Sequence, residues 1–256
     1  MIMQLHFQRS GQGEPLIILH GLFGTLENWG GQIKAFAEHY DVIAVDLRNH
    51  GRSPHTDQIN YELMAADVIE LLDQLGLPSA HILGHSMGGK VAMQLALNTP
   101  DRVKQLIVVD IAPVAYQHDH DDVFKGLFNV QLDSLTSRKE AETQLAEYVQ
   151  DPSVRAFLLK NLYRNDEKQF AWRMNLVLLH QDYDKIIAAP QGSPFTRPVL
   201  FIKGSESHYL LKTYQPAIMA LFPAARLKMI EGAGHWPHAE KPALFTRLVL
   251  NYLQGA

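Results

Sequence analysis

The chain has 256 residues, of which 46% are hydrophobic and 20% are charged, and its formal net charge is -4. These values are typical of a globular protein with a sizeable core, and the acidic balance offers no basic surface for a nucleic acid. There are no cysteines, which excludes disulfides, thiolate nucleophiles and cysteine-ligated metals. We therefore expect one large domain, or a core domain with an insertion, and no nucleic-acid partner.

The amino-terminal stretch and the overall hydropathy bear on location. Residues 1–6 lack a basic region followed by an apolar run, and no apolar run approaches the ~20 residues of a membrane span. The sequence therefore predicts no leader, no membrane span and a cytoplasmic protein.

Short apolar runs alternate with helical patterns along most of the chain. The expected strands cover residues 4–9, 16–19, 42–45, 80–83, 103–109, 198–203 and 225–230. Helical spacing is found at residues 29–36, 61–75, 91–97 and 242–252, and in the stretch that ends near residue 222. Strands that alternate with helices predict an α/β fold with a mainly parallel sheet and helices on both faces.

The alternation breaks between residues 116 and 196, where no clear buried strand is found and helical patterns prevail. Ser137 with Glu140 reads as a capping box, and Asp151 followed by proline reads as another helix start. We interpret this stretch as a helical insertion, a cap, that follows the strand ending at Asp110. The expected division is a core of residues 1–113 and 197–256 and a cap of residues 114–196.

The segment Gly84–Gly88 reads Gly-His-Ser-Met-Gly between an expected strand and an expected helix. In that context the pattern is a nucleophile elbow, in which the serine backbone is strained and the glycines remove side chains where strand and helix nearly touch. The turn would present the Ser86 hydroxyl at the tip of a strand. The motif predicts a serine hydrolase.

A serine hydroxyl is a weak nucleophile unless a base removes its proton. His235 lies in a glycine-relieved loop directly after the last expected strand, at the same sheet edge as Ser86. We therefore expect His235, rather than its neighbour His238, to be the base.

Taken in order, these residues resemble the α/β-hydrolase fold family over essentially the whole chain. The matching parts are Gly84–Gly89, the His20-Gly21 turn and Gly234-His235. The stretch Asp46–Ser53 is similar to the Asp-x-Arg-x-x-Gly-x-Ser loop of members with a helical cap, and its Asn-His variant resembles a bacterial acyl-esterase branch. The resemblance implies a doubly wound sheet with a helical lid and a cofactor-free carboxylesterase. Its expected substrates are short- to medium-chain acyl esters, with acyl-CoA thioesters as a further class.

The acid departs from the commonest pattern of the family. The usual aspartate position, in the turn after the next-to-last strand, holds Ser207. Asp110 follows the neighbouring strand, so a carboxylate there could also reach His235. In the esterase branch the residue at Asp110 looks like the acid, and Ser207 adds a hydrogen bond near the base. Glu206 is the second candidate for the acid.

The oxyanion of an acyl-transfer reaction needs two backbone donors. Met87 follows the serine and is expected to supply one amide, and Leu22 resembles the family's second donor. Phe23 and Trp236 are expected to line an apolar acyl pocket with them. His20 is expected to brace its loop.

Two other polar clusters are expected to have structural roles. The stretch His118–Asp122 reads His-Asp-His-Asp-Asp, but no spaced histidine or cysteine completes a metal site, so we interpret it as a solvated charged loop and expect no metal. Arg48 and His50 are expected to brace the loop after the second buried strand.

The sequence leaves three functions open. The first is a serine esterase that forms an acyl-enzyme on Ser86 and acts on a small-molecule ester or thioester. The second keeps the same triad for carbon–carbon bond hydrolysis or perhydrolysis. The third is a non-catalytic binding protein on the same fold. The presence of both Ser86 and His235 favours an enzyme.

Overall fold

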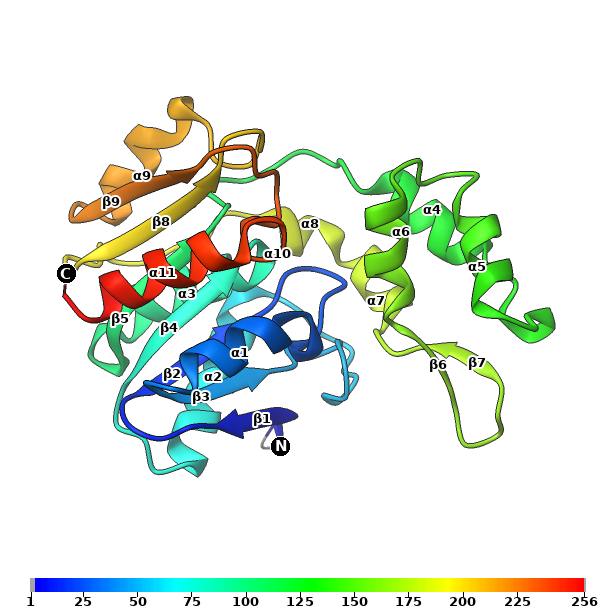
Figure 1. The fold of residues 1–256 in the computed structure, drawn as a ribbon, viewed down its shortest axis with the longest axis horizontal. Coiled ribbons are helices and arrows are strands. Elements are labelled where there is room, and N and C mark those ends of the chain that lie inside the picture. Colours follow the sequence, from blue (N-terminus) through cyan, green and yellow to red (C-terminus); the bar gives the residue numbers. More distant parts are fainter. Residues whose placement is uncertain (1–2, 256) are drawn as a thin grey trace.

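The computed structural model describes residues 3–255. Met1 and Ile2, on which the expectation of no leader partly rests, and Ala256 lie outside the described residues. The main sheet consists of β1 Phe7–Ser10, β2 Pro15–Leu19, β3 Asp41–Val45, β4 Ala80–His85, β5 Val103–Val109, β8 Val199–Gly204 and β9 Ala225–Ile230. The seven strands lie in the order β1-β3-β2-β4-β5-β8-β9 (Figure 1). Only β1 pairs antiparallel to its neighbour, so the sheet is mainly parallel as predicted.

Helices cover both faces of this sheet, which explains why its central strands are continuous apolar runs. Successive residues of β2 point to opposite faces: Ile17 belongs to one hydrophobic cluster, and Leu16 and Ile18 belong to the other. The first cluster includes side chains of α2 and α3, and the second includes side chains of α1 and α11 (Figure 1). The helices of the core are α1 Gly30–Phe36, α2 Tyr61–Gln74, α3 Met87–Asn98, α9 Gln215–Leu221, α10 Pro237–Glu240 and α11 Pro242–Leu253.

The chain between β5 and β8 forms a separate group of elements beside the sheet (Figure 1). We refer to residues 111–198 as the β5–β8 segment. It contains α4 Asp121–Asn129, α5 Arg138–Leu145, α6 Pro152–Leu159, β6 Leu162–Arg164, β7 Phe170–Trp172, α7 Leu176–Gln181 and α8 Tyr183–Ile187. The antiparallel hairpin of β6 and β7 was not expected from the sequence. Its strands have three residues each, too few for an alternating pattern to show, although Leu162 and Phe170 are buried.

Helices α5 and α6 of this segment begin where the sequence predicts, with one difference in the hydrogen bonds at the start of α5. Asp151 caps α6 by accepting the Ser153 N–H at 2.7 Å. The Ser137 hydroxyl oxygen accepts the Glu140 N–H at 3.2 Å, as a capping box requires. The Glu140 carboxylate, however, accepts the Thr136 N–H at 2.9 Å, so the second half of the box closes one residue earlier than expected.

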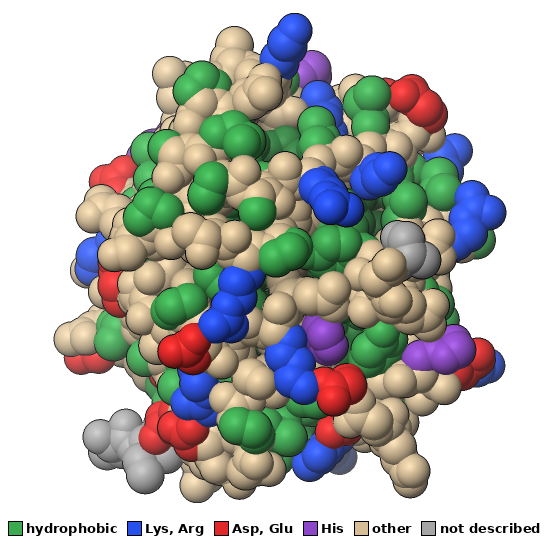
Figure 2. Space-filling view, turned by 90° about the vertical axis from the view of Figure 1, so that its left-hand side faces the viewer, with side chains coloured by type: hydrophobic (Ala, Val, Ile, Leu, Met, Phe, Trp, Pro, Cys, Tyr) green, Lys and Arg blue, Asp and Glu red, His purple; other side chains and the backbone are tan. Residues whose placement is uncertain are grey.

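The surface at the far end of the core, away from the β5–β8 segment, mixes side chains of several kinds. Figure 2 shows Lys and Arg side chains interspersed with Asp, Glu and hydrophobic groups on this face. None of the helices in the described part of the chain combines the length and the apolar character that a membrane crossing requires.

Parallel pairing brings four distant parts of the sequence to one edge of the sheet. Ser86 follows β4, Asp110 follows β5, Ser207 lies after β8, and His235 lies after β9. Because these strands are neighbours and run in the same direction, their carboxyl ends meet there.

Close packing of β4 against α3 makes the elbow sensitive to added volume. A Cβ at Gly84 would lie 2.1 Å from the Gly88 carbonyl oxygen, and backbone atoms cannot move aside as a side chain can. We expect Gly84→Ala to lower the free energy of unfolding by about 1–3 kcal/mol. Gly31 in α1 is the control, because a Cβ there meets nothing within 4 Å. Gly31→Ala should leave the stability unchanged or raise it by about 0.5 kcal/mol. Equal urea midpoints for the two variants would contradict this account.

Candidate active site

Ser86 occupies the sharp turn between β4 and α3. Its backbone has φ 52° and ψ -120°, which is strained for a residue with a side chain. The turn is possible because glycines lie two residues before and two residues after the serine: a Cβ at Gly88 would lie 2.4 Å from the His20 carbonyl oxygen. This geometry holds the Ser86 hydroxyl at the end of β4.

Three side chains form a continuous chain of hydrogen bonds at this point. His235 Nε2 lies 3.0 Å from Ser86 Oγ, and His235 Nδ1 lies 2.8 Å from Asp110 Oδ2. The Asp110 side chain is fully buried, and its Oδ1 accepts the Gly204 N–H at 3.1 Å. Such an arrangement can move a proton from the serine to the imidazole while the carboxylate stabilises the imidazolium.

The two candidate acids have different surroundings. The Ser207 hydroxyl donates a hydrogen bond to Asp110 Oδ2, and its oxygen accepts the Tyr209 N–H at 3.2 Å. Glu206 is exposed, and its carboxylate makes no hydrogen bond or ion pair with His235 among residues 3–255. The structure therefore places Asp110, and not Glu206, against His235.

Two more side chains hold His235 from other directions. The Tyr209 ring lies over the imidazole, with 4.1 Å between ring centroids and 31° between planes. The Tyr209 hydroxyl donates to Asp119 Oδ2 at 2.7 Å, which fixes the ring in place. In addition, His85 Nε2 donates a hydrogen bond to the backbone carbonyl oxygen of His235 at 2.7 Å.

His20 braces the loop that faces the elbow. Its Nδ1–H donates to the Gly21 carbonyl oxygen at 2.8 Å, and its Nε2 accepts the Leu47 N–H at 3.0 Å. The second bond requires the neutral ring, because a protonated Nε2 cannot accept a hydrogen bond. Burial lowers the pKa of His20 to about 4, which keeps the ring neutral at physiological pH.

Leu22 and Met87, the expected oxyanion donors, both lie next to Ser86 in the lining of one cavity. Met87 is the first residue of α3, where an N–H has no acceptor within the helix. Leu22, Met87 and Ser86 together line one small cavity. The arrangement makes two backbone donors available beside the serine.

A larger cavity of about 720 Å³ opens over Ser86 and His235. This volume is within the range of small-molecule sites. The core contributes Phe23 and Trp236, and α6 contributes Phe157, whose ring lies 5.6 Å from that of Trp236. The walls are mostly apolar, with the hydroxyl and the imidazole at one end.

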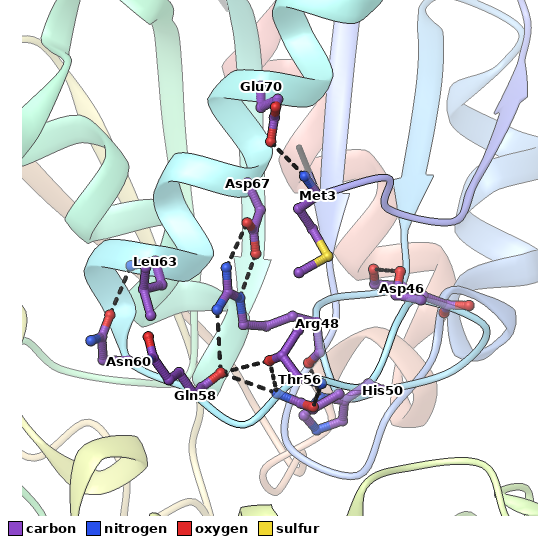
Figure 3. A network of polar contacts seen from close by, with 12 residues as sticks. Met3, Asp46, Arg48, His50, Thr56, Gln58, Asn60, Leu63, Asp67 and Glu70 are labelled. Carbon is purple, nitrogen blue, oxygen red and sulfur yellow. Dashed lines mark hydrogen bonds and ion pairs between the residues drawn. The ribbon is translucent and has the colours of Figure 1, made fainter. Parts of the chain in front are cut away.

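Arg48 and His50 lie outside the lining of this cavity and stabilise the loop after β3 (Figure 3). The buried Arg48 guanidinium donates to both carboxylate oxygens of Asp67, at 2.6 and 2.7 Å, and to the Gln58 carbonyl at 3.2 Å. His50 Nδ1–H donates to the Arg48 carbonyl at 3.0 Å. These bonds join the loop to α2, which is a bracing role.

The stretch His118–Asp122 lies at the surface, as expected of a solvated loop, with the Asp119 side chain 46% exposed, but two of its residues also face the site. Asp119 and His120 line the cavity above Ser86. Burial alone would raise the pKa of Asp119, but hydrogen bonds from His120, Tyr209 and Tyr183 outweigh it and lower the pKa. No cluster of three His, Cys, Asp or Glu side chains suited to a metal occurs within residues 3–255.

A comparison with family models identifies the architecture. The model described as the alpha/beta hydrolase fold matches residues 14–242. The chain belongs to the α/β-hydrolase fold family. The expected fold is thereby confirmed.

Similar proteins carry esterase and lipase names. Esterase YbfF of Escherichia coli is 36% identical over 247 residues, which is 96% of this chain and 95% of that protein. The mouse sn-1-specific diacylglycerol lipase ABHD11 is 40% identical, over 93% of this chain and 80% of that protein. A solved structure of a marine microorganism esterase has a TM-score of 0.95 and 40% identity, and covers 97% of this chain and 99% of its own.

Within this α/β hydrolase, the structure brings most residues expected at the site together. Ser86, His235, Asp110 and Ser207 are linked by hydrogen bonds. The cavity linings around the serine include Leu22, Phe23, Met87 and Trp236. Sequence reasoning missed Tyr209, His85 and Asp119 as neighbours of the site. The only signal for His85 was its position before Ser86. Asp119 belongs to the His118–Asp122 stretch, which gave no sign of a contact with the site, and no motif marked Tyr209.

His238, the neighbour of His235, packs away from the serine. Its ring stacks on Trp29 with 4.1 Å between centroids and 7° between planes, and its Nδ1 has no hydrogen-bond partner among residues 3–255. Burial, and secondarily the charge of His235, lower the pKa of His238 to about 3 from its ordinary value of 6.5. The unfolded chain therefore binds more protons than the folded α/β hydrolase between these values.

This difference makes His238 a source of acid sensitivity. The free energy of unfolding should fall as the pH drops below 6.5, by up to about 1.4 kcal/mol per pH unit from this residue. His238→Phe keeps a flat ring against Trp29 and removes the titration. We expect urea unfolding at about pH 6.5, 5.5 and 4.5 to show a shallower loss of stability in the variant. Parallel curves for the two proteins would refute the assignment.

Proposed function

We propose that the protein is a serine esterase that hydrolyses carboxylic esters of small molecules. Ser86 is the nucleophile, His235 the base and Asp110 the acid. The observation that carries the proposal is the unbroken chain of hydrogen bonds, 3.0 and 2.8 Å long, at the end of an apolar cavity. The esterase and lipase names of its relatives support the reaction class.

In the first half of the reaction, His235 Nε2 takes the proton of Ser86 as Oγ attacks the ester carbonyl. Asp110 holds the ring with Nδ1–H toward the carboxylate and stabilises the imidazolium. The Leu22 and Met87 amides donate to the tetrahedral oxyanion. The imidazolium then protonates the leaving alkoxide, and an acyl-enzyme remains.

In the second half, water replaces the alcohol. His235 takes a proton from the water as it attacks the acyl-enzyme, and Ser86 leaves with that proton. Acyl-CoA thioesters are a second substrate class for this chemistry, because their carbonyl passes through the same tetrahedral intermediate. No step requires a cofactor.

Residues 114–196 act as the cap in this proposal. Helix α6 supplies Val154 and Phe157 to the wall of the large cavity, and the loop before α4 supplies Asp119 and His120. These side chains face a site whose reacting groups all come from the core. The cap would therefore select the substrate, and the core would carry out the reaction.

Loss of the nucleophile is the direct test of this proposal. Ser86→Ala should reduce the hydrolysis of 4-nitrophenyl acetate by at least about 10³-fold, because no other group can form the acyl-enzyme. The measurement is the release of 4-nitrophenol, with thermal melting as the check on folding. Full activity in the variant would exclude the mechanism. A wild-type protein inactive on every ester would exclude the esterase and leave carbon–carbon hydrolysis or binding.

The acid is tested by a matched pair of amide substitutions. Asp110→Asn should lower kcat by about 10³- to 10⁴-fold, because the amide no longer fixes the productive tautomer of His235. Glu206→Gln, one residue from the usual position of the acid, should change kcat by less than about twofold. Near-normal turnover in the Asp110 variant would show that the acid is elsewhere.

A further inference from the structure

Ser86 lies between two cavities of very different size. The larger has a volume of about 720 Å³ and the smaller a volume of about 30 Å³. Both are lined by Ser86 and Leu22, so an ester bound at the hydroxyl can extend into each. The two halves of a substrate therefore meet very different limits on their size.

The position of His235 decides which half enters which cavity. In the proposed mechanism, on which this inference rests, His235 gives its proton to the departing alcohol. His235 lines the large cavity and does not line the small one. The alcohol therefore occupies the large cavity. The acyl chain points the other way, into the small cavity beside Met87.

The tyrosine hydroxyls in the wall of the small cavity already donate to other groups of the protein. Tyr61 donates to the backbone carbonyl of Ile186, and Tyr183 donates to Asp119 Oδ1 at 3.0 Å. The Tyr116 hydroxyl donates to the Tyr209 carbonyl and accepts an N–H at 2.9 Å. Beyond the carbonyl group, an acyl chain in this cavity gains contact area and no hydrogen bond from these tyrosines.

Lys90 fixes the same wall in place. Its buried Nζ donates to the carbonyl oxygens of Ile187 and Ala188, at 2.9 and 2.6 Å, and lies 4.6 Å from the centre of the Tyr116 ring. Lys90 belongs to α3, one turn after Ser86, while the two carbonyls lie at the end of α8. The bonds therefore hold α8 against the elbow helix and oppose any widening of the cavity.

We propose that the enzyme is selective for esters of acetyl size that carry a bulky, apolar alcohol. A volume of 30 Å³ holds about two water-sized groups. The methyl group of an acetyl ester fits this space. A hexanoyl chain does not fit unless α8 moves. The large cavity, by contrast, accepts a drug-sized alcohol.

Two substrate series test the proposal. With 4-nitrophenol as the constant alcohol, kcat/KM should fall at least about tenfold from the acetyl to the hexanoyl ester, since single methylenes in a fixed pocket already change discrimination by this order. With acetyl as the constant acyl group, replacing a small phenol with the larger 1-naphthol should not lower kcat/KM.

Widening the small cavity should shift the acyl preference. Ile186 lines it with a buried side chain, and the bond from Tyr61 reaches only its backbone, so Ile186→Ala removes wall atoms without breaking that bond. We expect the ratio of hexanoyl to acetyl kcat/KM to rise about tenfold. Val177→Ala is the control, because Val177 is 65% exposed and lines neither cavity. Should Ile186→Ala fail to fold, Ile187→Ala removes another part of the same wall.

The outcomes separate this inference from the proposed function. Hydrolysis that depends on Ser86 but is as fast for hexanoyl as for acetyl esters would overturn the acyl limit and leave the esterase intact. An unchanged acyl ratio in both isoleucine variants would also overturn it. Absence of hydrolysis for every ester would instead refute the esterase itself.

Discussion

The buried carboxylate of Asp110 is the constraint on which the site depends. An ionised carboxylate without water is stable only when hydrogen-bond donors replace its solvation. Its donors come from three places: the Gly204 N–H at the end of β8, the Ser207 hydroxyl just beyond it, and His235 after β9. Satisfying one charge therefore fixes the relative positions of three strand ends. The imidazole is held where it can reach Ser86.

The direct pairing of β5 with β8 explains how Asp110, the proposed acid, can reach His235 from the tip of β5. Val109 is in register with Ile202, so the residues that follow these strands lie side by side. A carboxylate on either tip can approach the same histidine. In this chain the β5 tip carries the carboxylate, and Ser207 at the β8 tip has become a donor to it. One position thus supplies the carboxylate and the other supplies a hydroxyl donor to the same hydrogen-bond network.

The parts of the fold that could be predicted from the sequence have local causes. The buried strands are continuous apolar runs, and the elbow requires glycines at Gly84 and Gly88 because backbones touch there. The hairpin of β6 and β7 could not be predicted because its strands of three residues are too short to show an alternating pattern. The ring of Tyr209 over His235 could not be predicted because it depends on a contact between distant segments. Asp119 is exposed, as expected, but its hydrogen bonds with Tyr183 and Tyr209 could not be predicted for the same reason. Its partners lie 64 and 90 residues away.

The residues proposed to carry out the reaction and those proposed to select the substrate also differ in what positions them. The reacting groups come from strand ends of the core, whose spacing is set by backbone pairing. The proposed limits on substrate size come largely from the β5–β8 segment, where side-chain packing sets them. Phe157 packs against Trp236 at the large cavity, and Ile186 and Lys90 line the small one. Substitutions in that segment can change the cavities without moving the hydrogen-bonded triad. One reaction can therefore serve different esters in related proteins, provided that the buried carboxylate keeps its donors.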